Sequence, residues 1–227
     1  MSANTKYETV RIDHLGIVSG ISREIGLVET IDEAIGQTGR KVSCGEGVLA
    51  MILNALGFSS RALYLMPEYM ENKPVGELIR TGLTGEDFND DTIGRCLDDI
   101  YEYGVTELFA RVALKALEVY GIEHQFVHLD SSSFHLHGKY DIESPEEEMV
   151  SITYGYSRDH RPDLKQVVAQ LITSHKTNLP VWLEVLSGNS SDKESFRKSV
   201  KAYCQHLAGK EKPYFIMDSA GYSEKNL

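Results

Sequence analysis

The feature that most constrains the fold is a change in the spacing of apolar residues near residue 121. Before this point, apolar residues recur about every three or four positions, as they do in amphipathic helices. After it, short apolar runs stand between turn residues, which is typical of strands. The sequence therefore predicts an all-α N-terminal domain over residues 1–121 and a sheet-containing domain over residues 122–227.

In the first half, the clearest helix signal precedes residue 56. Ser43 and Glu46 have the spacing of a capping box, and Gly57 follows the last apolar residue of the segment. The other expected helices cover about residues 15–25, 28–35, 90–103 and 106–120. The turns at residues 35–39 and 57–61 are compatible with a helix-turn-helix that contacts DNA. Packing or dimerisation is the alternative role for this domain.

The second half alternates strands with a helix. Expected strands cover residues 126–130, 166–173, 179–186 and 214–218, and a helix is expected over residues 193–207. The turn at residues 174–178 should join the second and third strands as a hairpin. One sheet with helices packed on it follows, so the predicted class of this half is α/β.

Composition and charge narrow the possible partners. The 227 residues include 23 Lys and Arg and 34 Asp and Glu, which gives a net charge of −11. Residues 1–121 carry −8 and residues 122–227 carry −3. Neither half is basic overall, so any DNA must contact local basic clusters.

No segment looks membrane-bound or secreted. No apolar stretch reaches the roughly 20 residues that a membrane helix needs, and the N-terminus has no apolar run like that of a signal peptide. Cys44, Cys96 and Cys204 are far apart and form no C-x-x-C motif. We therefore expect reduced thiols and a cytoplasmic location, with no membrane partner.

Two of the expected strands end in an aspartate. Residues 126–129 lead into Asp130, and residues 214–217 lead into Asp218. Open α/β sheets bind ligands at the carboxyl ends of their strands, so the two carboxylates would converge if these strands are parallel neighbours. Mg²⁺ or Mn²⁺ would relieve their repulsion, because both ions prefer carboxylate oxygens. In the alternative interpretation, each aspartate only stabilises a turn.

Four stretches of the second half resemble the catalytic core of insertion-sequence transposases of the DDE class. In chain order they are His128-Leu-Asp130-Ser-Ser-Ser, Gly155-Tyr-Ser-Arg-Asp-His-Arg-Pro-Asp-Leu-Lys-Gln166, Gly188-Asn-Ser-Ser-Asp192 and Met217-Asp218-Ser-Ala-Gly-Tyr-Ser. The resemblance implies an RNase H-like core, with Asp130 and Asp218 as the catalytic, metal-binding aspartates and Mg²⁺ or Mn²⁺ as the cofactor. It also implies that the partners are transposon ends, target DNA and further copies of the chain.

The sequence departs from this family at its third acidic ligand. In the family, that ligand is a glutamate on a helix well downstream of the second aspartate. The sequence ends nine residues after Asp218, and Glu224 stands too close to that aspartate to be the ligand. We therefore expect a partial RNase H-like core and a truncated transposase, inactive in cleaving DNA by itself.

The densest basic cluster lies inside the longest of the matched stretches. Arg158, Arg161 and Lys165 are the expected DNA contacts, since Arg and Lys bind phosphates. Alternatively, Asp159 and Asp163 neutralise the arginines and the segment is a solvated loop.

Two other functions remain open at this point. The chain could be a non-catalytic fragment that binds DNA or a complete transposase. It could also be a metal hydrolase that uses Asp130 with His135 and His137, whose His-x-His spacing puts both imidazoles on one side of a strand. A preference for Zn²⁺ over Mg²⁺ or Mn²⁺ would favour the hydrolase.

Overall fold

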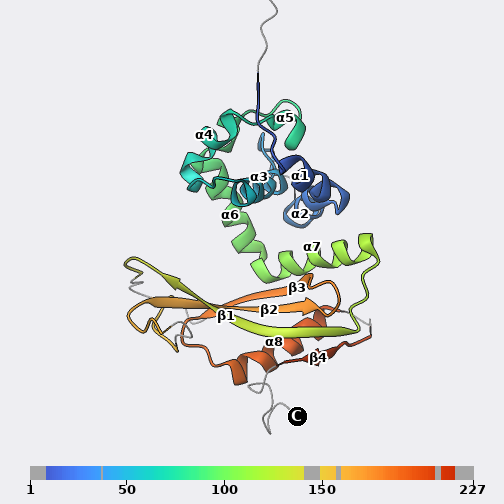
Figure 1. The fold of residues 1–227 in the computed structure, drawn as a ribbon, viewed down its shortest axis with the longest axis vertical. Helices are drawn as coiled ribbons and strands as arrows, with labels where there is room; N and C mark the ends of the chain where they lie inside the picture. The colour runs from blue at the N-terminus through green and yellow to red at the C-terminus, as the bar shows by residue number, and fades with distance from the viewer. Residues whose placement is uncertain (1–8, 37, 141–148, 157–159, 208–210, 218–227) are drawn as a thin grey trace, which may run out of the picture. The chain divides into compact units, whose positions relative to one another are not determined.

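The structure is a computed structural model that describes residues 9–36, 38–140, 149–156, 160–207 and 211–217 (Figure 1). The chain divides into two compact units, Met1–Val119 and Tyr120–Leu227. This division lies two residues before the boundary expected from the sequence. In the described residues, no helix is both long enough and apolar enough to span a membrane.

Unit 1 is helical, as the apolar periodicity predicts. Its elements are α1 (Leu15–Glu24), α2 (Leu27–Ile35), α3 (Cys44–Leu56), η1 (Leu63–Leu65), α4 (Met66–Glu71), α5 (Val75–Leu78), η2 (Gly85–Phe88), α6 (Asp90–Tyr103) and α7 (Val105–Tyr120). The five helices expected from the sequence are confirmed as α1, α2, α3, α6 and α7. The four short helical elements between residues 63 and 88 were not expected.

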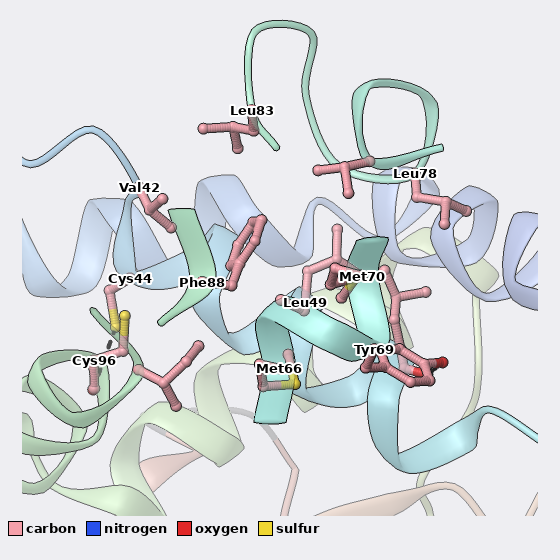
Figure 2. Close-up of a cluster of buried hydrophobic side chains, with 14 of the residues drawn as sticks. Val42, Cys44, Leu49, Met66, Tyr69, Met70, Leu78, Leu83, Phe88 and Cys96 are labelled. Atoms are coloured by element: carbon pink, nitrogen blue, oxygen red, sulfur yellow. Dashed lines mark hydrogen bonds between the residues drawn. The ribbon is translucent and has the colours of Figure 1, made fainter. Parts of the chain in front are cut away.

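The centre of unit 1 is built around α3. The capping box is confirmed: the Ser43 hydroxyl accepts a hydrogen bond from the Glu46 amide at 3.2 Å, and the Ser43 amide donates to the Glu46 carboxylate at 3.0 Å. Helix α3 then buries apolar side chains such as Leu49, which contributes to one cluster with Met70 and Phe88 (Figure 2). Each of these three side chains is at most 1% exposed. Burial of this cluster is the main driving force for folding of the unit.

Unit 2 contains a four-stranded mixed sheet and one long helix. The elements are β1 (Phe126–Leu136), β2 (Lys165–Ser174), β3 (Pro180–Ser187), α8 (Asp192–His206) and β4 (Tyr214–Ile216). The strand order is β3-β2-β1-β4. Strands β1, β2 and β3 pair antiparallel, and β4 pairs parallel to β1. The mixed α/β class and the hairpin of β2 and β3 are therefore confirmed.

Helix α8 covers one face of this sheet. Its buried residues Phe196, Ser199 and Tyr203 recur at helical spacing. The Tyr203 ring packs edge-on against Trp182 of β3, with centroids 5.8 Å apart, and against Phe215 of β4, with centroids 6.2 Å apart. Trp182 is thus a core residue, and α8 links the two outer strands of the described sheet.

Candidate functional site

Strand β1 carries Asp130 in its middle and not at its end. Its antiparallel pairing with β2 runs without a break from Val127 opposite Ser174 to Leu136 opposite Lys165. The expectation that this strand ends at Asp130 is therefore wrong. The serines after Asp130 suggest a loop in the sequence, but pairing with β2 gives their backbone groups hydrogen-bond partners and extends the strand.

Asp130 lies on the sheet face that α8 does not cover. Paired residues of neighbouring strands share a face, so Leu129, Ile172 and Trp182 all belong to the face under α8. Successive residues of a strand point to opposite faces, which puts Asp130 on the other one. Its side chain is exposed, and one carboxylate oxygen accepts a hydrogen bond from the Ser131 amide at 2.8 Å. A solvated ligand could therefore reach the carboxylate.

The strand that leads toward Asp218 is the parallel neighbour of β1. Phe126 pairs with Tyr214 and His128 pairs with Ile216, so each pair is 88 residues apart in the sequence. Asp218 itself lies outside the described residues. The two-aspartate interpretation requires that these two strands are parallel neighbours. This condition is confirmed.

A row of rings lies next to Asp130 on the same face. The rings of Phe126 and Tyr214 stack with their centroids 5.3 Å apart. His128 stacks with His175 at 5.0 Å, and its Nε2 lies 2.7 Å from Nδ1 of His175. The alternation of a strand puts His128 on the face of Asp130, but the sequence gives no sign of His175, which the turn after β2 brings to the start of β1.

The histidines of the hydrolase interpretation do not join Asp130. Asp130 and His135 stand five residues apart in an unbroken strand, so they lie on opposite faces of the sheet. His137 follows the end of the strand. Across the described ranges, no three His, Cys, Asp or Glu residues lie close enough to hold a metal ion. The geometry therefore gives no support to a site made from these three residues.

The basic cluster of Arg158, Arg161 and Lys165 contains an arginine whose charge is neutralised by an acid. Arg161 donates two hydrogen bonds to Asp163, from Nε at 2.9 Å and from Nη2 at 2.8 Å. The guanidinium lowers the pKa of Asp163 to about 2. Lys165 donates from Nζ to the Tyr140 carbonyl at 3.2 Å, and Arg158 lies outside the described residues. Any phosphate at Arg161 must therefore compete with a carboxylate that is already bound.

Three residues of the stretches that resemble transposases, Gly155, Gln166 and Gly188, lie against one another. Gln166 is 1% exposed, and its Nε2 donates to the Gly188 carbonyl at 2.7 Å and to the Tyr156 carbonyl at 3.2 Å. A Cβ on Gly155 would overlap the Gly188 carbonyl, and a Cβ on Gly188 would overlap the Gln166 carbonyl. The backbones approach so closely that only glycine fits at either position. These residues fix the segment before β2 to the end of β3, which is a structural role.

Three basic side chains of unit 1, two of which follow the first turn of the expected helix-turn-helix, are also paired with acids. Three ion pairs of unit 1 are Arg40–Asp99, Lys41–Asp87 and Arg80–Glu46. The distance from Lys41 Nζ to Asp87 is 2.7 Å. Arg40 and Lys41, which follow the turn at residues 35–39, are thus neutralised and are weak candidates for phosphate contacts.

Comparison with known proteins adds one finding, which concerns unit 1. A family model described as a domain of unknown function, DUF4277, matches residues 7–114. Searches of curated proteins and of solved structures gave no match. The matched residues fall within the helical unit.

Proposed function

We propose that this protein is an insertion-sequence transposase of the DDE class, which uses a divalent cation for phosphoryl transfer on DNA. The observation that carries the proposal is the parallel pairing of β1 and β4 at a constant separation of 88 residues. Continued for two more residues, the same separation joins positions 130 and 218. Both acidic residues of the resemblance would then stand on neighbouring strands, on the face that α8 leaves open.

The proposed catalytic core is RNase H-like. Support comes from the order β3-β2-β1-β4, in which an antiparallel meander is followed by a helix and then by a strand parallel to β1. In this arrangement α8 packs on one face of the sheet (Figure 1), and Asp130 lies on the opposite face. The resemblance in the sequence and the topology agree on the same two strands.

Asp130 suits the binding of Mg²⁺ or Mn²⁺, because its carboxylate is exposed and supplies hard oxygen ligands. The described residues provide this carboxylate and do not complete a metal site among themselves. A bound cation would activate an attacking oxygen and offset the charge that develops on the phosphate. Asp130 would position the cation, and Asp218 is its proposed partner.

The substrates that follow from this proposal are the transposon ends and target DNA, and the active form would be a homo-oligomer. Arg158, Arg161 and Lys165 remain proposed DNA contacts. Arg161 is the weakest of the three, because Asp163 already occupies its guanidinium.

The affinity of the full chain for Mn²⁺, measured by titration calorimetry, tests the proposal. Asp130→Asn and Asp218→Asn should each weaken binding by at least about tenfold, since even partners beyond the direct ligands contribute that much at metal sites. Asp163→Asn is the matched control, because it removes one carboxylate at a site paired with Arg161. Unchanged Mn²⁺ affinity in Asp130→Asn would contradict the proposal and favour a non-catalytic DNA-binding protein.

A further inference from the structure

A groove between α8 and the start of β4 brings three basic side chains together. Arg197 and Lys201 come from α8, and Lys212 comes from the segment before β4. The groove has a volume of about 600 Å³, and Val200 and Phe215 form part of its apolar floor. We call it the α8–β4 groove.

The fold fixes the positions of these side chains. Arg197 and Lys201 are four residues apart, so they project from the same side of α8. Lys212 is held nearby because the Tyr214 amide donates to the Gln125 carbonyl at 2.8 Å, at the point where β4 joins the sheet. The floor is anchored as well, since the Phe215 ring packs against the buried Tyr203.

Among the described residues, no acid balances the charge of this groove. All three basic side chains are exposed, and none of them forms an ion pair with another residue that the structure describes. No Asp or Glu is among the described residues that line the groove. Like charges four residues apart on a helix repel each other. Arg161 and, in unit 1, Arg40, Lys41 and Arg80 differ, because each is paired with an acid.

Cys204 and Lys212 line the same groove. Burial raises the pKa of this thiol, and the Lys212 ammonium acts in the opposite direction. A cation thus lies close to an apolar surface, where an anion would meet less competition from water.

We propose that the α8–β4 groove binds the phosphodiester backbone of DNA, through Arg197, Lys201 and Lys212. The choice of DNA rests on the proposed function. Three convergent cations above an apolar floor suit a chain of phosphates joined by sugars, and phosphate contacts dominate affinity for DNA. These contacts position the duplex and carry no sequence information themselves.

The test compares two triple variants with the same charge. The groove triple removes the three positive charges of the groove and consists of Arg197→Gln, Lys201→Gln and Lys212→Gln. The control triple removes three exposed positive charges that lie outside the groove and consists of Lys139→Gln, Lys176→Gln and Lys198→Gln. Each set changes the net charge of the chain from −11 to −14. Binding to a labelled random-sequence DNA duplex is measured by fluorescence anisotropy at several salt concentrations, in buffer with EDTA.

The groove triple should lose at least about tenfold in affinity, and its slope of log K against log salt should fall by up to about 2.7, because each lost phosphate contact removes about 0.9. The control triple should stay within about twofold of the wild type. Arg197→Lys, which keeps the charge, should retain most of the slope. Equal losses in both triples, a wild-type slope in the groove triple, or no DNA binding by the wild type would each overturn the proposal.

Two further outcomes separate the proposals from each other. If polyglutamate displaces the duplex as well as unlabelled DNA does at equal charge, the groove recognises acidic peptides and the DNA assignment is overturned. EDTA makes the assay independent of the metal site. Groove-dependent DNA binding without Asp130-dependent Mn²⁺ binding would support the groove and contradict the catalytic proposal, and the reverse pair of results would do the opposite.

Discussion

Replacing Tyr203 with Phe should stabilise unit 2. The Tyr203 side chain is fully buried, and its hydroxyl has no hydrogen-bond partner among the residues that the structure describes. An unsatisfied buried polar group costs about 1–3 kcal/mol. Phe keeps the ring contacts with Trp182 and Phe215, whose centroids lie 5.8 and 6.2 Å away. We therefore expect the free energy of unfolding to rise by about 1 kcal/mol or more.

Tyr69→Phe is the matched control in unit 1. Tyr69 is also buried, but its hydroxyl donates a hydrogen bond to the Leu53 carbonyl at 2.8 Å. Loss of this bond leaves a buried carbonyl unpaired, so the variant should be destabilised by about 1–2 kcal/mol. Urea denaturation, followed by circular dichroism and by tryptophan fluorescence from Trp182, measures both changes. If Tyr203→Phe destabilises the protein as much as Tyr69→Phe does, the Tyr203 hydroxyl has a partner, such as a buried water, and the reasoning fails.

Two other predictions concern titration and backbone packing. Burial raises the pKa of Tyr203 to about 12 in the folded state. Titration of this hydroxyl therefore leaves the stability unchanged below pH 10, the ordinary range of tyrosine, and lowers it as the pH rises toward 12, because the unfolded chain loses its proton first. The loss of stability on going from pH 9 to pH 12 should be smaller in Tyr203→Phe than in the wild type, and an equal loss would contradict this. Gly188→Ala should destabilise unit 2 by at least about 2 kcal/mol, because its Cβ would overlap the Gln166 carbonyl. The control is Gly20→Ala inside α1, where open space surrounds the new Cβ, and it should be neutral or stabilising by up to about 1 kcal/mol. Thermal unfolding compares the two variants, and equal melting temperatures would refute the packing argument.

Residues 63–88 show what helical periodicity cannot reveal. Helices α3 and α6 extend over several turns, so their apolar faces repeat and can be recognised in the sequence. Helix α5 has four residues and α4 has six, and neither is long enough to repeat a pattern. Their positions follow from burial of side chains such as Met70 and Leu78 in the core, which depends on the rest of the unit.

Asp130 shows the limit of judging strand ends from composition. The sequence correctly predicts a strand before Asp130 and another before Asp218, and their parallel pairing is confirmed. It misplaces the end of the first strand, because polar residues after Asp130 look like a loop until β2 is known to pair with them. Since the strand continues, Asp130 and His135 fall on opposite faces, which no local pattern indicates.

Gln166 illustrates a second limit. Its side chain holds the Gly188 carbonyl, 22 positions later in the sequence, and Gly155 fits against the same group. The glycines were visible in the matched stretches, but their mutual contact depends on the turn between β2 and β3. Part of a stretch that suggests DNA binding is therefore used for packing.

The separation of 88 residues between paired positions of β1 and β4 also has a consequence for folding kinetics. Closing a chain loop of that length costs about 2 kcal/mol more than closing the hairpin of β2 and β3, in which the paired residues Thr173 and Pro180 are seven positions apart. Strand β4 has only three residues, so its ladder with β1 offers little to offset that cost, and the ring contacts of Tyr214 and Phe215 must contribute. The hairpin and β1 can therefore form early, whereas β4 docks late and is among the first elements to open. A DNA-cutting centre shared by β1 and β4 would be assembled only in the last step of folding, which would keep a newly made chain from acting on DNA before its sheet is complete.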